Sequence, residues 1–193
     1  MSAQRALFVE DLEPDADPAD SWSTEPDVMT IVHGFWPDGI VLDCCTNHHA
    51  IALGFVRALV AWTKRDNCLA QPTWDVHELV KRPRTTCWLQ PPYSREGAPI
   101  IADWARRWDR GEMHETLALV RLDTSTDAWK TLAARASSVV LFRRRLAHYE
   151  AGVRQDGSNF CSAMLLCTRA DPTVRHRALE AAVGTFGDVY RKR

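Results

Sequence analysis

The amino-acid sequence predicts an α/β fold, in which a mostly parallel sheet is covered by helices on both faces. Short β-branched and apolar segments alternate with segments of helical periodicity through most of the 193 residues. The hydrophobic share of 46% suffices for one sizeable core, and no apolar run approaches the length of a transmembrane helix. The N-terminus also lacks the charged and then apolar pattern of a signal peptide. We therefore expect a single domain that acts in the cytoplasm.

An acidic segment precedes this domain. Residues 1–27 hold eight acids and one base, although the net charge of the whole chain is only −1. Residues 10–21 combine this charge with two prolines and almost no apolar side chains, a composition that does not support folding. We expect residues 1–21 to form a disordered tail and residues 22–193 to form one domain, without a sizeable separate domain for target recognition.

The first predicted elements are a helix, a strand and a second helix. Residues 27–35 have helical periodicity, and Pro26 suits the first position of a helix. Residues 40–42 are a short apolar run, typical of a buried strand that ends at Asp43. Residues 50–62 again show helical periodicity.

A strand and a long helix follow. Residues 84–90 are rich in β-branched, aromatic and apolar side chains, which predicts a buried strand. Residues 96–110 have helical periodicity and end at Gly111. Trp104 and Trp108 lie four residues apart on one face of this helix, so we expect both to pack in the core.

The C-terminal half continues the alternation of strands and helices. Strands are predicted over residues 115–122, 137–143 and 160–168, and helices over residues 125–135 and 172–183. Open α/β sheets bind ligands outside the carboxyl ends of their strands. The segments that follow the predicted strands are therefore the places to search for a site.

The strand at residues 84–90 ends in the most informative stretch of the sequence. Pro91 and Pro92 follow Gln90, and neither can donate a hydrogen bond to a sheet. They form a rigid loop with free carbonyl oxygens, between the amide of Gln90 and the ring of Tyr93. This arrangement suits the binding of an exocyclic amine, so amino methylation is the first hypothesis.

These residues resemble the hallmark of the phage-type DNA N6-adenine methyltransferase (Dam-like) family. The hallmark is an Asp- or Asn-led Pro-Pro-Tyr, commonly followed by Ser or Gly, and here Ser94 follows. The resemblance covers roughly residues 22–168 and includes four further segments in the family's order. Residues 22–26 are similar to Trp-x-Thr-Pro, residues 40–47 to Leu-Asp-Pro-Cys-Ala/Ser-Asn, residues 126–129 to Thr-Asp-Thr-x-Trp, and residues 140–146 to an Arg-Phe-x-x-Gly-Arg-Leu strand.

Three positions depart from the family's pattern. Gln90 replaces the usual Asp or Asn, Cys44 replaces a proline, and Glu25 interrupts the Thr-Pro pair. A glutamine keeps the acceptor carbonyl but adds a methylene group. The geometry of amine binding must therefore shift, or the strand must end slightly earlier.

The resemblance implies a fold, a cofactor and a substrate. The fold is the Rossmann-like fold of methyltransferases that depend on S-adenosylmethionine, and the reaction transfers a methyl group to the exocyclic amine of adenine in double-stranded DNA. A phage or prophage origin, with action in the host cytoplasm, is implied as well. The positions that the family's pattern places at the cofactor are Trp22, Thr24, Asp43, Cys45, Thr46, Asn47 and Asn67. Asp66 is the alternative to Asn67 for the contact with the adenine amine of the cofactor.

We expect the Gln90 loop to carry the chemistry. The Gln90 side-chain oxygen and the Pro91 carbonyl accept the two amine hydrogens, while Tyr93 stacks on an extruded base. Accepting both hydrogens favours rehybridisation of a nitrogen whose lone pair is delocalised into the ring. No dedicated general base is required, since a proton can leave after methyl transfer.

The charge of the predicted domain suits a polyanionic partner. Beyond residue 27 the chain holds 23 bases against 17 acids, and 20 of its 24 bases are arginine, whose guanidinium group binds phosphate with two donors. The candidate DNA contacts are Ser94, Asp127, Trp129, Arg143, Arg144 and Arg145. A solvated, arginine-rich surface explains the charge equally well. Such a short chain must read a short sequence, bind with low specificity, or gain surface as a homodimer.

Several of these residues can also be explained by a purely structural role. Asp43, Asn47 and Asp127 each precede a predicted helix or lie at its start and can serve as caps. The six cysteines have no Cys-x-x-Cys spacing, so we expect them to be reduced and packed rather than paired. Cys44, Cys45, His48 and His49 do not predict a metal site, because adjacent side chains at a strand end point apart and no second ligand pair has standard spacing.

Two other classes of function remain open from sequence alone. The departures at Gln90 and Cys44 are compatible with a catalytically inactive homologue that only binds DNA or cofactor. A methyltransferase that acts on RNA, on cytosine or on a protein amide nitrogen is the other alternative, because loops of this type hold several planar nitrogen acceptors.

Overall fold

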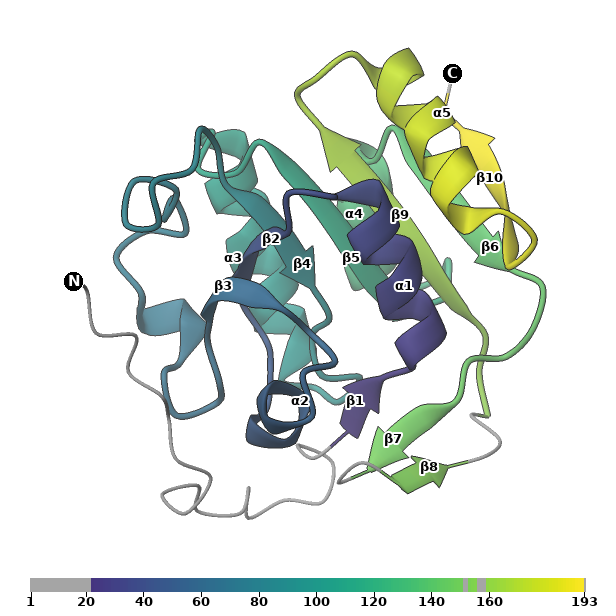
Figure 1. The fold of residues 1–193 in the computed structure, drawn as a ribbon, viewed down its shortest axis with the longest axis horizontal. Coiled ribbons are helices and arrows are strands. Elements are labelled where there is room, and N and C mark those ends of the chain that lie inside the picture. Colours follow the sequence, from purple (N-terminus) through teal and green to yellow (C-terminus); the bar gives the residue numbers. More distant parts are fainter. Residues whose placement is uncertain (1–21, 151–152, 156–158, 193) are drawn as a thin grey trace.

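A computed structural model describes residues 22–150, 153–155 and 159–192, and the predicted tail at residues 1–21 lies outside this range. Seven strands form the larger sheet in the order β10-β6-β9-β5-β4-β2-β3, and a smaller sheet has the order β1-β7-β8 (Figure 1). The strands are β1 (Trp22–Thr24), β2 (Ile40–Asp43), β3 (Ala58–Ala61), β4 (Thr86–Leu89), β5 (Glu115–Arg121), β6 (Ser138–Phe142), β7 (His148–Glu150), β8 (Val153–Gln155), β9 (Ser162–Thr168) and β10 (Gly187–Arg191). The helices are α1 (Pro26–Phe35), α2 (His48–Ala52), α3 (Gly97–Asp109), α4 (Asp127–Arg135), α5 (Pro172–Val183) and the 3-10 helix η3 (Cys68–Ala70).

The larger sheet is mixed, which corrects the expectation of a mostly parallel one. Of its six neighbouring pairs, β3-β2, β2-β4 and β4-β5 are parallel, while β5-β9, β9-β6 and β6-β10 are antiparallel. The reason is the position of β9, which inserts between β5 and β6 in the opposite direction and so turns two neighbouring pairs antiparallel. The parallel half contains the strand ends from which the candidate loops emerge.

Helices cover both faces of the larger sheet, as predicted. In Figure 1, α1 and α5 lie on the near face, while α3 and α4 lie behind the sheet. Successive side chains of a strand point to opposite faces, so each central strand contributes to two cores. Trp88 of β4 packs with α1 and α5, whereas its neighbours Cys87 and Leu89 pack with Trp104 and Trp108 of α3. The expectation that these two tryptophans belong to the core is confirmed.

Most predicted elements are confirmed within one to two residues at each end, but one helix was wrong. The segment at residues 50–62, predicted as one helix, contains the end of α2, a turn and strand β3. Gly54 has φ +64, a left-handed conformation that ends the helical path. Beyond it, Ala58 and Val60 pair with β2, so tertiary pairing overrides the local periodicity.

The smaller sheet was not predicted from sequence. Its strands are three residues long, too short to show a periodicity. Figure 1 shows β1, β7 and β8 below one end of the larger sheet, near α2. This end carries the carboxyl termini of β2 and β4, and the smaller sheet therefore lies beside the two candidate loops.

Candidate active site

The loops that follow β2 and β4 lie side by side at the carboxyl edge of the sheet. Asp43, the last residue of β2, is the register partner of Trp88 in β4. The next backbone amide, that of Cys44, donates to the Trp88 carbonyl at 3.5 Å. The Asp43 and Gln90 loops therefore follow neighbouring parallel strands, at one of the strand ends where the sequence predicted that a site should be sought.

Asp43 is a buried carboxyl group between two strands of the parallel half. Its side chain is 2% exposed, and its Oδ1 accepts a hydrogen bond from the Cys45 amide at 3.1 Å. Burial raises the pKa of the Asp43 carboxyl from 3.8 to about 7, although the Cys45 amide and the Thr46 hydroxyl favour the ionised form. Asp43 closes a turn rather than capping α2. A buried acid with a pKa near neutrality is typical of a functional site.

Asn47, and not Asp43, caps the helix. The Asn47 Oδ1 accepts from the Ala50 amide at 2.8 Å, which stabilises the first turn of α2. The capping alternative for Asn47 is thus confirmed, and its side-chain oxygen is engaged. Thr46 differs: its buried hydroxyl makes no hydrogen bond of regular geometry to a described residue. Buried polar groups of this kind mark places where a ligand can bind.

The segment after β3 borders the Asp43 loop. The Thr46 amide donates to the Trp62 carbonyl at 3.0 Å, which joins the two segments. The Asp66 carboxylate accepts from the amide and hydroxyl of Thr63 at 2.8 and 2.9 Å. Asn67, in the left-handed conformation with φ 49, accepts from the Leu69 amide at 3.2 Å and caps η3. The side chains of Asp66 and Asn67, the two candidates for contact with the adenine amine of the cofactor, are therefore both engaged in local turns.

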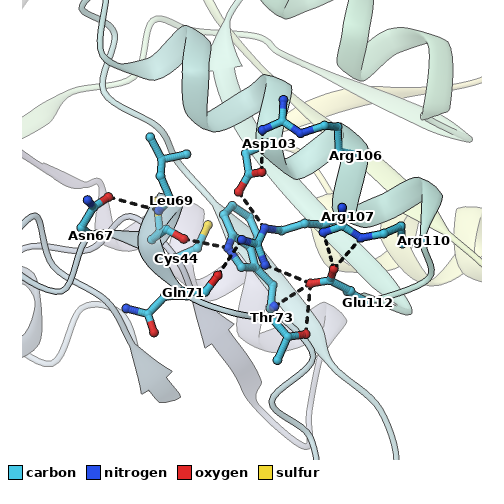
Figure 2. Close-up of polar contacts among 12 residues, drawn as sticks. Cys44, Asn67, Leu69, Gln71, Thr73, Asp103, Arg106, Arg107, Arg110 and Glu112 are labelled. Carbon is cyan, nitrogen blue, oxygen red and sulfur yellow. Dashed lines mark hydrogen bonds and ion pairs between the residues drawn. The ribbon is translucent and has the colours of Figure 1, made fainter.

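A buried ionic network holds the chain beyond η3 against α3. Figure 2 shows the Arg107 guanidinium at its centre, donating to Asp103 at 2.6 Å, to Glu112 at 3.1 Å and to the Gln71 carbonyl at 2.7 Å. Glu112 also accepts from the Trp74 amide at 2.7 Å. Burial opposes its ionisation, but the bonds from Trp74, Arg110 and Arg107 outweigh burial and lower its pKa. The network fixes residues 71–74 at the border of the site.

Gln90 lies directly beyond β4, and Thr24 contacts it from the smaller sheet. The Thr24 hydroxyl donates to the Gln90 side-chain oxygen, although the two residues are 66 positions apart. Thr24, expected at the cofactor, is 3% exposed and is held by its place in β1. The structure describes only the backbone of Trp22, opposite Glu150, so its expected cofactor contact lies outside the described atoms.

A close backbone approach supports the two prolines. A Cβ atom at Gly97, the first residue of α3, would overlap the carbonyl oxygen of Pro92 and lie 3.5 Å from the Pro91 Cβ. Only glycine fits this position without a shift of the loop. Ser94 accepts from the Glu96 amide at 3.3 Å and is exposed next to this junction.

Tyr93 packs into an aromatic cluster. Its ring lies edge-on to His148 of β7 and to Phe160, with ring centres 5.7 and 4.9 Å apart and interplanar angles of 75° and 76°. Its hydroxyl is buried near Ser162, but neither oxygen makes a hydrogen bond of regular geometry within the described residues. Burial raises the pKa of Tyr93 to about 12, so the hydroxyl is neutral at physiological pH. The cluster fixes the plane of the ring.

The three consecutive arginines differ in their surroundings. Arg143 donates to Asp188 at 2.6 and 3.2 Å on the surface. Arg144 binds the buried Glu25 carboxylate with two donors, at 2.9 and 2.8 Å, and also donates to Asp27 at 2.9 Å. Arg145 is exposed. Arg144 therefore braces β1 through the Glu25 carboxylate.

The remaining DNA-binding candidates lie on α4. Asp127 is fully exposed at the start of the helix, and its Oδ1 lies 3.6 Å from the Lys130 ammonium. The cap is Thr126, which accepts from the Trp129 amide at 3.2 Å. Trp129 is partly buried and packs against the core cluster that contains Trp104 and Trp108.

The cysteines are free thiols, as predicted; four of the six are packed in the interior, whereas Cys45 is partly buried and Cys161 is exposed. Cys44 lies 3.6 Å from Cys45 and 3.9 Å from Cys87, measured between sulfur atoms, and burial raises the pKa of Cys44. Within the described residues, no group of three or more His, Cys, Asp and Glu side chains is arranged to hold a metal ion. Among the same residues, none of the helices combines the length and apolar character needed to cross a membrane.

Sequence reasoning missed the residues that hold the Gln90 loop from outside. Glu25 was noted only as an interruption, and His148 and Phe160 were not singled out. The one available signal was Glu25 itself, an acid placed between a threonine and a helix-starting proline. The pairing of β1 with β7, which joins distant segments, left no local pattern.

A family model described as DNA N-6-adenine-methyltransferase (Dam) matches residues 14–180. No curated protein matches the sequence. The matched region contains the Asp43 loop, the Gln90 loop and all three strands of the smaller sheet.

Proposed function

Because the chain belongs to the DNA N-6-adenine-methyltransferase (Dam) family, and is therefore an enzyme that methylates adenine in DNA, we propose that its Asp43 and Gln90 loops form the active site. The observation that carries the proposal is that the two loops follow neighbouring parallel strands: Asp43 pairs with Trp88, and the Cys44 amide donates to the Trp88 carbonyl, two residues before Gln90. Cofactor and substrate must meet for methyl transfer, and two adjacent loops can hold one each. The larger sheet then serves as the Rossmann-like sheet of the methyltransferase fold.

S-adenosylmethionine is the proposed cofactor, and it supplies a methyl group on a positively charged sulfonium. The residues of the Asp43 loop fit this group, because a buried carboxyl and the buried Thr46 hydroxyl lie together there. Ionised Asp43 would offset the positive charge of the cofactor. Cys45, Asn47 and either Asp66 or Asn67 would complete the pocket through backbone groups as well as side chains, since one side-chain oxygen of Asn47, of Asp66 and of Asn67 is engaged in a local turn.

The Gln90 loop is proposed to hold the adenine. The Gln90 oxygen has a second lone pair beside the one that faces Thr24, so it can accept one amine hydrogen while the Pro91 carbonyl accepts the other. Pro92 keeps this loop rigid against Gly97. Tyr93, whose ring is fixed by edge contacts, offers a surface for an extruded base. No base is needed to remove a proton before methyl transfer.

DNA contacts outside the base are proposed for exposed side chains near this edge. Ser94 and Asp127 follow β4 and β5, whose carboxyl ends are neighbours, and Arg143 and Arg145 follow β6. This limited surface suits the recognition of a short DNA sequence or binding with low specificity. Action in the host cytoplasm of a phage is part of the same proposal.

Direct measurement of cofactor binding tests the proposal. Isothermal titration with S-adenosylmethionine should give a measurable Kd for the wild type, and Thr46→Val, which removes only the hydroxyl, should weaken binding several-fold. Thr126→Val, a matched change at the α4 cap away from the Asp43 loop, should leave the Kd unchanged. Equal affinity of all three proteins would remove Thr46 from the cofactor site.

A further inference from the structure

The smaller sheet contacts both ends of the Gln90 loop, and this contact suggests a role beyond fold stability. Thr24 and His148 are register partners across β1 and β7. The Thr24 hydroxyl reaches Gln90, and the His148 ring reaches Tyr93. Both residues are buried, so they belong to the support of the loop rather than to an open surface.

Gln90 needs such support more than a shorter side chain would. A glutamine side chain has one more rotatable bond than Asp or Asn and loses more conformational freedom when it is fixed. A hydrogen bond from Thr24 to its oxygen removes part of this freedom before substrate binds. The oxygen keeps a second lone pair for an incoming amine.

Thr24 is itself anchored through the next residue. The Glu25 carboxylate is 5% exposed and accepts two hydrogen bonds from Arg144, at 2.9 and 2.8 Å, and one from the Ala147 amide at 3.2 Å. Charge-assisted pairs with two parallel donors fix geometry well. The Glu25 carbonyl also accepts from the Val28 amide at 3.0 Å, which joins β1 to α1.

We infer that Thr24 is a positioning residue for methyl transfer: its hydroxyl orients the Gln90 side-chain oxygen toward the adenine amine. The inference rests on the proposed role of Gln90. It replaces the expected cofactor contact of the Thr24 hydroxyl by a contact with the substrate-binding side chain. Thr24 then affects the rate of the reaction rather than the affinity for S-adenosylmethionine.

Steady-state kinetics on unmethylated double-stranded DNA tests the inference. Thr24→Val keeps the shape of the side chain but removes its hydroxyl, and it should lower kcat by about tenfold to 100-fold. The KM for S-adenosylmethionine should change less than twofold, and Thr24→Ser should restore kcat to within about threefold of the wild type. In a Gln90→Asn background, whose shorter side chain ends farther from Thr24, Thr24→Val should have no further effect.

Three results would overturn the inference: an unchanged kcat in Thr24→Val, an equal loss in Thr24→Ser, or the same loss in the Gln90→Asn background. A raised KM for S-adenosylmethionine with unchanged kcat would show that Thr24 contacts the cofactor, as the sequence predicted. Gln90→Ala separates this inference from the proposed function. If Gln90→Ala retains full kcat, the proposed role of Gln90 fails and the inference with it, whereas loss in Gln90→Ala without loss in Thr24→Val overturns the inference alone.

Discussion

Thr24 and His148 lie opposite each other on β1 and β7, and they contact opposite ends of the same loop. Thr24 donates to the oxygen of Gln90, and the His148 ring packs 5.7 Å from that of Tyr93. Burial lowers the pKa of His148, which keeps the imidazole neutral at physiological pH despite the nearby Glu25. The conformation of the candidate catalytic loop therefore depends on a small sheet built from two distant parts of the chain.

Two substitutions of Tyr93 should distinguish the contribution of its ring from that of its hydroxyl. The hydroxyl is buried without a regular hydrogen bond, so Tyr93→Phe should keep the stability and the kcat within about threefold. Tyr93→Ala removes the ring from the cluster with His148 and Phe160 and should cost about 3 kcal/mol of folding free energy and more than about tenfold in kcat. Thermal unfolding and turnover measure both effects. A large loss of kcat in Tyr93→Phe would show that the hydroxyl participates in the reaction.

The buried Asp43 should make stability depend on pH. Its folded-state pKa of about 7 lies above the ordinary value of 3.8, so its contribution to stability is fully present below pH 3.8 and is lost as the pH rises through 7. Asp43→Asn should therefore be more stable than the wild type at pH 8, by up to about 4 kcal/mol, and equal to it near pH 3.8. Urea unfolding at several pH values measures this difference. Asp127→Asn, at a fully exposed position, serves as the control for the loss of one negative charge.

Cofactor binding should depend on the same group. A cationic cofactor favours ionised Asp43, so the Kd for S-adenosylmethionine should fall as the pH rises from 6 to 7 and level off above 7, by at most about tenfold per pH unit. In Asp43→Asn this dependence should disappear and binding should be weaker at pH 8. Titration calorimetry at pH 6, 7 and 8 provides the comparison. An identical pH profile in the variant would place Asp43 outside the cofactor site.

The Arg107 network should contribute more to stability than its surface neighbour does. The Arg107 side chain is 6% exposed and pairs with Asp103 and Glu112, so Arg107→Ala leaves one buried and one partly buried carboxylate without this partner. It should destabilise the fold by about 3–5 kcal/mol. Arg106→Ala, in which a side chain that is 64% exposed loses its pair with Asp103, should cost less than about 1 kcal/mol. Urea unfolding measures both free energies. Similar losses of unfolding free energy in Arg107→Ala and Arg106→Ala would contradict a special role of the Arg107–Asp103 pair.

Gly97 should be indispensable for the position of Pro92. A Cβ atom there overlaps the Pro92 carbonyl oxygen, so Gly97→Ala should destabilise the protein by at least about 1 kcal/mol and lower kcat. Gly34→Ala in α1 is the matched control, because its Cβ would meet only the Ala182 Cβ at 3.8 Å. It should stabilise the helix by about 0.5–1 kcal/mol and leave kcat unchanged. Retained kcat in Gly97→Ala would mean that the loop tolerates a shift.

Elements with a long periodicity or a clear stop could be predicted from the sequence. Residues 172–183 form α5 with the predicted bounds, because Pro172 starts the helix and Gly184 follows its end. Residues 50–62 were misjudged, since an apolar helical pattern concealed the β2-β3 pairing. The antiparallel β9 could not be foreseen either, because strand order is set by packing across the whole sheet and not by local pattern.

For the candidate site, the sequence identified the two loops but not their support. Pro91, Pro92 and Asp43 have a local signature that is readable in one chain. The contacts of Thr24 with Gln90 and of Arg144 with Glu25 join residues 66 and 119 positions apart, respectively. Such pairs become visible only once the chain is folded.

The product of the reaction and its dependence on Gln90 test the proposed active site. Purified wild-type protein and Gln90→Ala are incubated with unmethylated double-stranded DNA and S-adenosylmethionine, the DNA is digested to nucleosides, and N6-methyladenine is quantified by mass spectrometry. The wild type should produce N6-methyladenine, and Gln90→Ala should produce at least about 100-fold less while its cofactor binding is unchanged. Equal amounts from both proteins would show that the Gln90 loop does not hold the adenine amine.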